Sequence, residues 1–223
     1  MFLKIGHRGA KAYEPENTLR SFKKALDLGA NAIEIDARLT KDGELVCLHD
    51  KKLERTTNGK GLVNERTLKE IKKLDAGKGE KVPTVEEALR FIDKKAKVLI
   101  DLRNDEAVDK VLKILKKTGL IEKTILISSK ADILKHVKEI EPNIETGMWY
   151  VKHQNPLKTA LEIKLNYLKP IWFSCHSEII KKAHENGIKV LTWVVNEKSK
   201  VQELVKKGVD GIVTDKPDIL NTV

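Results

Sequence analysis

The chain has 223 residues, enough for one full hydrophobic core, and it holds no run of 18 or more apolar residues that would predict a transmembrane helix. Lysine and arginine outnumber aspartate and glutamate by 43 to 33, but the two signs alternate along the sequence and aromatic residues make up only 4% of it. That pattern is typical of solvated helix faces and argues against a nucleic-acid groove. Residues 1–9 do not resemble a signal peptide, so we expect a cytoplasmic protein.

Short apolar runs alternate with amphipathic helical patterns from the first residues onward. After the first run, Leu19, Phe22 and Leu26 share one face of a helix that Gly29 ends. Later helical patterns cover residues 107–117, 131–140, 178–186 and 199–207. Eight strands separated by helices favour a TIM (β/α)8 barrel. We expect these strands at residues 2–6, 32–36, 97–101, 124–128, 144–150, 171–175, 189–195 and 211–215.

One connection departs from this alternation. Residues 38–44 contain the turn signal Asp42-Gly43, and residues 45–49 then read as a strand that folds back beside the second one. Residues 51–81 form the longest excursion before the next barrel strand. We therefore expect a single domain over residues 1–223 with a short insertion at about 51–81.

Two carboxylates lie near the end of the second predicted strand. Glu34 and Asp36 lie two residues apart on an extended chain, so their side chains project to the same face. In a barrel mouth they would repel one another unless a cation sits between them, and an oxygen-rich site suits Mg²⁺ or Ca²⁺. The alternative is that one acid faces solvent or pairs with a lysine.

Two histidines also lie at strand ends, where a barrel collects its chemistry. His7 follows the first strand and His49 ends the strand that folds back. A lone histidine at such a place is more often structural, but a pair that flanks carboxylates and arginines fits phosphoryl transfer. One imidazole would activate the nucleophile and the other would protonate the leaving oxygen.

Short motifs follow one another in order from residue 5 to residue 217. They are His7-Arg8-Gly9, Pro15-Glu16-Asn17-Thr18, Glu34-Ile35-Asp36, His49-Asp50, Arg55-Thr56-Thr57-Asn58-Gly59, Leu74-Asp75-Ala76-Gly77, Pro83-Thr84, Trp193-Val194-Val195-Asn196 and Gly211 to Pro217. This ordered set resembles the glycerophosphodiester phosphodiesterase family, a family of metal-dependent TIM-barrel phosphodiesterases. The resemblance implies hydrolysis of glycerophosphodiesters to sn-glycerol 3-phosphate and an alcohol, with roles in glycerol and lipid metabolism. The partner would be this small molecule, with neither nucleic acid nor stable membrane insertion.

The resemblance also implies a role for individual residues. The catalytic acid/base pair would be His7 and His49, and one divalent cation, Mg²⁺ or Ca²⁺ with Mn²⁺ as a third candidate, would bind the acids. Asn17 is also expected to cap the first helix, and Glu16 to bond His7 or Arg8. The implied metal ligands are Glu34, Asp36 and Asp101, the substrate or phosphate contacts are Arg8, Arg103 and Trp193, and the supporting residues are Glu16 and Asn17.

Three segments depart from the family pattern. The third barrel strand ends in Asp101-Leu102-Arg103, where the family has a glutamate and a lysine. The acidic side chain is therefore shorter, and the basic side chain is a forked guanidinium instead of an ammonium. Residues 78–81 are an abbreviated form of a segment that commonly holds an aromatic residue. Residues 128–130 lack the usual phenylalanine. These changes leave two alternatives open: a lysophospholipase D-type enzyme acting on lipids, and a barrel that binds phosphate esters without catalysis.

Overall fold

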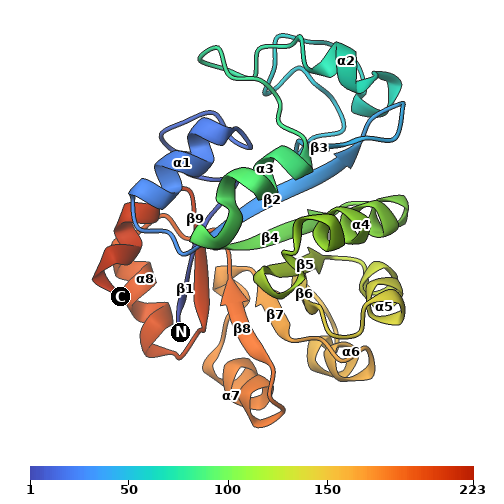
Figure 1. Cartoon of the computed structure of the whole chain (residues 1–223). Helices are drawn as coiled ribbons and strands as arrows, with labels where there is room; N and C mark the ends of the chain where they lie inside the picture. Colours follow the sequence, from blue (N-terminus) through green and yellow to red (C-terminus); the bar gives the residue numbers. More distant parts are fainter.

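Eight parallel strands close into a barrel, which confirms the predicted TIM-barrel fold. The computed structural model describes the backbone of residues 1–223 and every side chain except that of Lys94. Pairing of β1 with both β9 and β2 closes the ring, and helices cover its outside (Figure 1). The barrel strands are β1 (Leu3–Gly6), β2 (Ala32–Leu39), β4 (Lys97–Leu102), β5 (Thr124–Ser128), β6 (Glu145–Tyr150), β7 (Tyr167–Pro170), β8 (Lys189–Thr192) and β9 (Gly211–Thr214).

The helices follow from amphipathic patterns whose apolar faces pack on the barrel. Two of them, α3 and the short α2, begin at capping boxes formed by Thr84 with Glu87 and by Thr67 with Glu70. The helices expected from the sequence are present within one residue at each end. The full set is α1 (Leu19–Asp27), α2 (Leu68–Ile71), α3 (Val85–Ile92), α4 (Val108–Thr118), α5 (Ala131–Ile140), α6 (Pro156–Glu162), α7 (Ser177–Glu185) and α8 (Lys198–Lys206).

The hydrophobic core has an inner and an outer part. Inside the barrel, residues such as Ile5, Leu99, Ile127 and Val213 pack together, and every one of these four is fully buried. Outside the barrel, two larger clusters fill the space between the strands and the surrounding helices. The closed and filled barrel is therefore a rigid platform for whatever side chains lie at its carboxyl end.

One predicted strand was wrong. The apolar run at 171–175 forms a single 3-10 turn, Trp172–Ser174, and the barrel strand β7 lies just before it at Tyr167–Pro170. The true strand carries Lys169, whose side chain is buried against an acid on a distant strand. The sequence does not reveal that Lys169 belongs to a core strand, because the acid that neutralises its charge lies 135 residues away.

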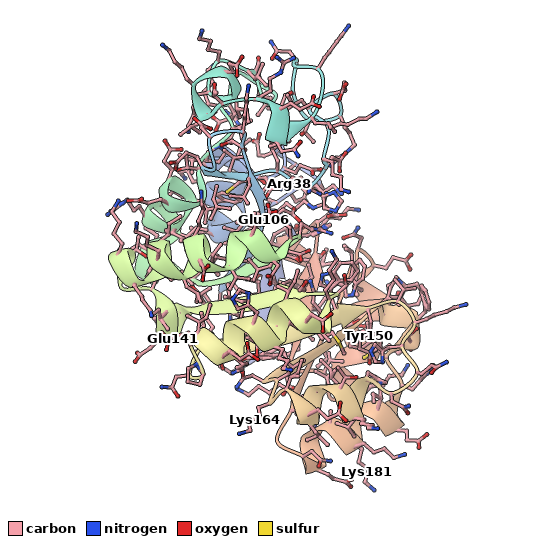
Figure 2. All side chains as sticks on the ribbon, turned by 90° about the vertical axis from the view of Figure 1, so that its right-hand side faces the viewer. Arg38, Glu106, Glu141, Tyr150, Lys164 and Lys181 are labelled. Carbon is pink, nitrogen blue, oxygen red and sulfur yellow. The ribbon has the colours of Figure 1, made fainter. Side chains whose placement is uncertain are left out.

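The short strand β3 (Leu45–Cys47) folds back antiparallel on β2, as predicted, with Ala37 opposite Cys47. It ends at Cys47 rather than at His49, which lies in the bend that follows. The segment at 51–81 follows it and lies beyond the ends of β2 and β3 (Figure 1). It packs on a small cluster of its own, which includes Leu53, Val63 and Ile71. Arg38 lies where the barrel meets this segment and donates from Nε to the carbonyl of His49 at 2.8 Å (Figure 2).

In the part of the chain that the structure describes, every helix is too short or too polar to cross a bilayer.

The turn after β1 aims two predicted site residues into the barrel mouth. Gly9 adopts a φ of +87°, and the amide of Ala10 donates to the carbonyl of Ser21 at 3.1 Å. A Cβ atom on Gly9 would lie 2.3 Å from the Ser21 hydroxyl oxygen and 2.6 Å from its carbonyl carbon. Only glycine therefore allows α1 to pack so closely on the turn that carries His7 and Arg8.

Replacing Gly9 by alanine tests this close approach. We expect Gly9→Ala to lower the free energy of unfolding by about 3 kcal/mol or more, because it combines backbone strain with a steric overlap. Gly119→Ala is the matched control, since Gly119 also has a positive φ, +70°, but has no atom within 4 Å of the added Cβ position. That variant should lose only about 1 kcal/mol, the cost of the backbone strain alone. Urea denaturation measures both, and equal losses would contradict the packing argument.

Candidate active site

Three carboxylates converge at the carboxyl end of the barrel. Glu34 and Asp36 lie on β2, and Asp101 lies on the neighbouring β4 directly opposite Asp36 in the parallel register. All three residues are at most 5% exposed. The structure thus brings together the three acids that the family resemblance implied as metal ligands.

Each of these carboxylates has a cation beside it. The Arg103 guanidinium lies 2.8 Å from Asp36 and 2.9 Å from Asp101, so that one side chain bridges two acids. Arg8 also lies beside Asp36, with 3.2 Å between its Nε and Oδ2. Glu34 pairs instead with a residue that the sequence did not single out, since its Oε1 accepts from the Lys169 ammonium at 2.7 Å.

These surroundings move the pKa values of the acids apart. Burial works to raise the pKa of Asp36, but the charges of Arg8 and Arg103 outweigh it and lower that pKa to about 2. The same balance between burial and the Lys169 charge leaves the pKa of Glu34 below its usual value. Burial dominates at Asp101, where the nearby acids add to it and the pKa rises to about 7. Asp101 is therefore the acid that most needs further positive charge.

Several buried polar atoms in the cluster lack a hydrogen-bond partner. Glu34 Oε2 is an acceptor of this kind, and the Nε atoms of Arg8 and Arg103 are donors. Burying unpaired polar atoms is costly, so their presence points to ligands: a cation for the carboxylate oxygen and an anion such as phosphate for the two guanidinium groups. The residue types therefore fit a divalent cation. Among the described residues, however, no three His, Cys, Asp or Glu side chains form a ready-made metal cage.

The two predicted histidines each have a carboxylate partner. His7 Nδ1 lies 2.6 Å from Asp215 at the end of β9, and His49 Nδ1 lies 2.6 Å from the adjacent Asp50. Such a bond fixes the ring orientation and leaves Nε2 for proton transfer. Asn196 holds Asp215 in turn, donating from its amide at 2.7 Å. The sequence analysis included Asp50 and Asp215 in the matching segments but gave them no role, although the adjacent His-Asp pair was a visible signal.

The supporting residues lie where the resemblance placed them, with one correction. Glu16 accepts from Arg8 at 2.8 Å, as expected, and also binds Arg55. The prediction that Asn17 caps α1 was wrong, because Thr18 is the cap and accepts from the Ser21 amide. Asn17 has a positive φ of 57° and donates from its amide to Asp36 at 2.9 Å. Its side chain serves the carboxylate cluster rather than the helix end.

Two tryptophans line one side of the site. Trp193 follows β8, and its ring lies 5.3 Å from that of Trp149 in an edge-to-face arrangement. Trp149 was missed by sequence reasoning because it lies inside a strand with no motif around it. Its indole N–H donates to Asp101 at 3.1 Å, so it holds one of the three acids directly.

Two cavities are lined by residues that contact this centre. One, of about 540 Å³, is lined by Glu16, Arg55 and the segment Asp75 to Gly77, which precedes the shortened stretch at 78–81. The other, of about 660 Å³, is lined by Arg38 and Arg103 among other residues. Glu16, which binds Arg8, and Arg103, which bridges Asp36 and Asp101, thus connect the carboxylate cluster to these cavities.

Comparison with known proteins decides the family. Residues 7–219 match the Glycerophosphoryl diester phosphodiesterase family. The chain belongs to this family. Among its relatives, a glycerophosphodiester phosphodiesterase of Caldanaerobacter subterraneus subsp. tengcongensis is 38% identical over 98% of this chain and 96% of that protein. A second enzyme of that name, from Bacillus subtilis, is 33% identical over 99% of this chain and 86% of its own length.

Solved structures agree with the family assignment. A phosphodiesterase from Oleispira antarctica, in complex with the product sn-glycerol-3-phosphate, superposes with a TM-score of 0.93 at 27% identity, covering 98% of this chain and 94% of that one. A glycerophosphodiester phosphodiesterase from Agrobacterium tumefaciens gives a TM-score of 0.90 at 28% identity over the full length of both chains. The predicted family and enzyme class are therefore confirmed, and the roles of individual residues remain predictions.

The environment of His49 predicts its protonation state. Burial lowers its pKa below the usual 6.5, although Asp36 and the bond to Asp50 oppose the shift. NMR titration of the imidazole should give a pKa below 6.5, and Asp50→Asn should lower it further because one opposing contact is lost. The half-buried His136, whose pKa is raised by its bond to Asp105, is an internal control that should titrate above 6.5.

The lowered pKa of His49 also makes the stability of the fold depend on pH. With the folded pKa of His49 below 6.5, this group stabilises the fold at higher pH, and that contribution is lost as the pH falls from about 6.5 through the folded pKa. A His49 pKa at or above that of His136 would contradict the inference that the surroundings of the half-buried His49 favour its neutral form.

Proposed function

We propose that this enzyme hydrolyses glycerophosphodiesters to sn-glycerol 3-phosphate and an alcohol, using His7 and His49 as the acid/base pair beside a divalent cation. The observation that carries the proposal is the pairing of each histidine with a carboxylate on either side of a buried cluster of acids and arginines. Acid/base groups and cationic phosphate contacts are the parts that phosphodiester cleavage needs. We further propose that residues 1–223 act as one domain, and its cytoplasmic location stays a prediction.

Glu34, Asp36 and Asp101 are the residues that would hold the cation, Mg²⁺, Ca²⁺ or Mn²⁺. When bound, such an ion supplies Lewis-acid stabilisation of charge on the phosphoryl oxygens. The free Oε2 atom of Glu34 supports this, since it is a buried acceptor without a donor. The raised pKa of Asp101 also supports a bound cation, because added positive charge would lower that pKa again.

The substrate phosphate would lie against the guanidinium groups. Arg103 presents a buried Nε–H without an acceptor, and a phosphate oxygen satisfies such a donor well. The Nε–H of Arg8 lies 3.2 Å from Asp36 Oδ2 but is not hydrogen-bonded to it, so a phosphate oxygen would compete with that carboxylate for this donor. Glu16 keeps Arg8 in place by accepting from its Nη1. Trp193, half-buried at the mouth, would pack against the glycerol carbons.

The histidines would move the protons in two steps. One takes the proton of the glycerol 2-hydroxyl as that oxygen attacks phosphorus, and the other protonates the alcohol oxygen as its bond to phosphorus breaks. Water then opens the cyclic phosphate, and the two imidazoles exchange roles. Asp215 and Asp50 hold each Nδ1, which directs Nε2 toward the reacting oxygens.

Removing either imidazole tests this assignment. We expect His7→Ala and His49→Ala each to lower kcat by about 10²- to 10⁴-fold, because one proton transfer then lacks its carrier. Release of sn-glycerol 3-phosphate from a panel of glycerophosphodiesters is the measurement. The matched control is His136→Ala, since His136 also pairs with an aspartate, at 2.8 Å, but lies on α5 outside the site. Near-full turnover by either site variant would remove that histidine from the mechanism.

Metal removal tests the second part of the proposal. Dialysis against a chelator should abolish release of sn-glycerol 3-phosphate, and adding back Mg²⁺, Ca²⁺ or Mn²⁺ should restore it, because the buried acids then regain their cation. Unchanged turnover in the chelator would show that Arg8, Arg103 and Lys169 suffice as the cationic groups.

One observation favours a lipid substrate as a second candidate. Phe173 is 52% exposed and Val151 is 41% exposed, and both side chains are large and apolar. They follow β7 and β6, whose carboxyl ends face the mouth, and the Ser174 hydroxyl donates to the Val151 carbonyl at 3.2 Å, which brings the two loops together. These side chains could contact an acyl chain. The assay panel should therefore include lysophospholipids, with Phe173→Ser as the variant that would selectively lose them.

A further inference from the structure

A buried lysine lies at the proposed metal site. Lys169 on β7 is 2% exposed, and its ammonium lies 2.7 Å from Glu34 Oε1 on β2. Three strands separate β7 from β2 in the sheet order, so this ion pair spans the interior of the barrel mouth. Burying a lysine is costly unless its charge is paired, and Glu34 is the acid that pairs with it here.

The lysine is held at this place from its other side. Its carbonyl oxygen accepts from the indole N–H of Trp193 at 3.1 Å, and its ammonium lies 5.6 Å from the centre of that ring. The other two acids, Asp36 and Asp101, have Arg8 and Arg103 beside them, so Lys169 is the cation that pairs with Glu34.

From these contacts we propose that Lys169 is a built-in counter-cation that competes with the divalent ion for Glu34 and weakens metal binding. This inference rests on the proposed metal-dependent function. Glu34 has one oxygen on Lys169 and one without a partner, so an ion that binds both oxygens must displace the ammonium. An ion that binds only the free oxygen still lies close to a like charge in a poorly solvated site, where repulsion is strong.

The competing ammonium also explains what stabilises the acids without metal. Glu34 lies among buried carboxylates that repel one another, and the Lys169 ammonium, 2.7 Å from its Oε1, offsets its charge. The same contact occupies one of the two Glu34 oxygens and so reduces the affinity for the ion.

Metal binding by charge variants tests the proposal. Isothermal titration with Mg²⁺, Ca²⁺ and Mn²⁺ should show at least about tenfold tighter binding to Lys169→Met and Lys169→Gln than to the wild-type enzyme. The matched control is Lys97→Met, because Lys97 pairs with Glu145 at the opposite end of the barrel and should leave metal binding unchanged. Equal or weaker binding by both Lys169 variants would overturn the proposal.

A stability measurement gives a second readout. Without metal the Lys169 variants should have a lower Tm than the wild type, because Glu34 is left without its partner. Saturating metal should raise their Tm by more than it raises that of the wild type, as tighter binding requires. A smaller metal-induced rise in Tm in the variants than in the wild type would argue that Lys169 does not compete with the ion.

Labelling of the wild-type enzyme decides the matter if neither variant folds. The Lys169 amine should react slowly with an amine-reactive reagent in the chelator and faster with saturating metal, as read by mass spectrometry, and an unchanged rate would overturn the proposal. Binding and turnover are measured separately. Tighter metal binding by the variants with no release of sn-glycerol 3-phosphate by the wild type would leave this inference standing while the proposed function failed.

Discussion

The cost of burying three carboxylates side by side governs the rest of this site. Glu34, Asp36 and Asp101 are almost fully removed from water, where ionised groups are expensive to keep. The structure offsets that cost with cations placed within ion-pair distance of them. Each of these cations comes from a different strand end, so the electrostatic requirement of the cluster ties together segments that are far apart in the sequence.

The barrel fold brings the side chains of this cluster together and holds them in place. Parallel strands deliver their carboxyl ends to one mouth, and the interior below is filled with aliphatic side chains that keep each strand in register. Tight local turns then direct the side chains. The close approach of Gly9 to Ser21 sets the direction of His7 and Arg8, and the hydrogen bonds of Asn17 fix the carboxylate of Asp36.

One departure from the family pattern, at the end of β4, has a local structural explanation. The shorter Asp101 is reached by two donors at once, the guanidinium of Arg103 and the indole N–H of Trp149. A single nitrogen of Arg103, Nη2, contacts both Asp36 and Asp101. The Arg103 guanidinium also lies 5.6 Å from the Trp149 ring, so the acid, the arginine and the tryptophan form one connected unit.

The sequence by itself determined the alternation of strands and helices, the strand that folds back at Leu45, and the positions of both histidines and all three acids. These features are written in local periodicity and in short motifs, which need no knowledge of distant contacts. Tertiary structure decided what those side chains touch. Lys169 has no visible partner in the sequence because Glu34 lies 135 positions earlier, and the strand at 167–170 stands directly before the more apolar run that was predicted in its place. The partner of His7 is Asp215, 208 positions away, and only closure of the barrel brings the two together. Pairings of this kind depend on where the strands meet in space, which hydrophobic periodicity does not encode.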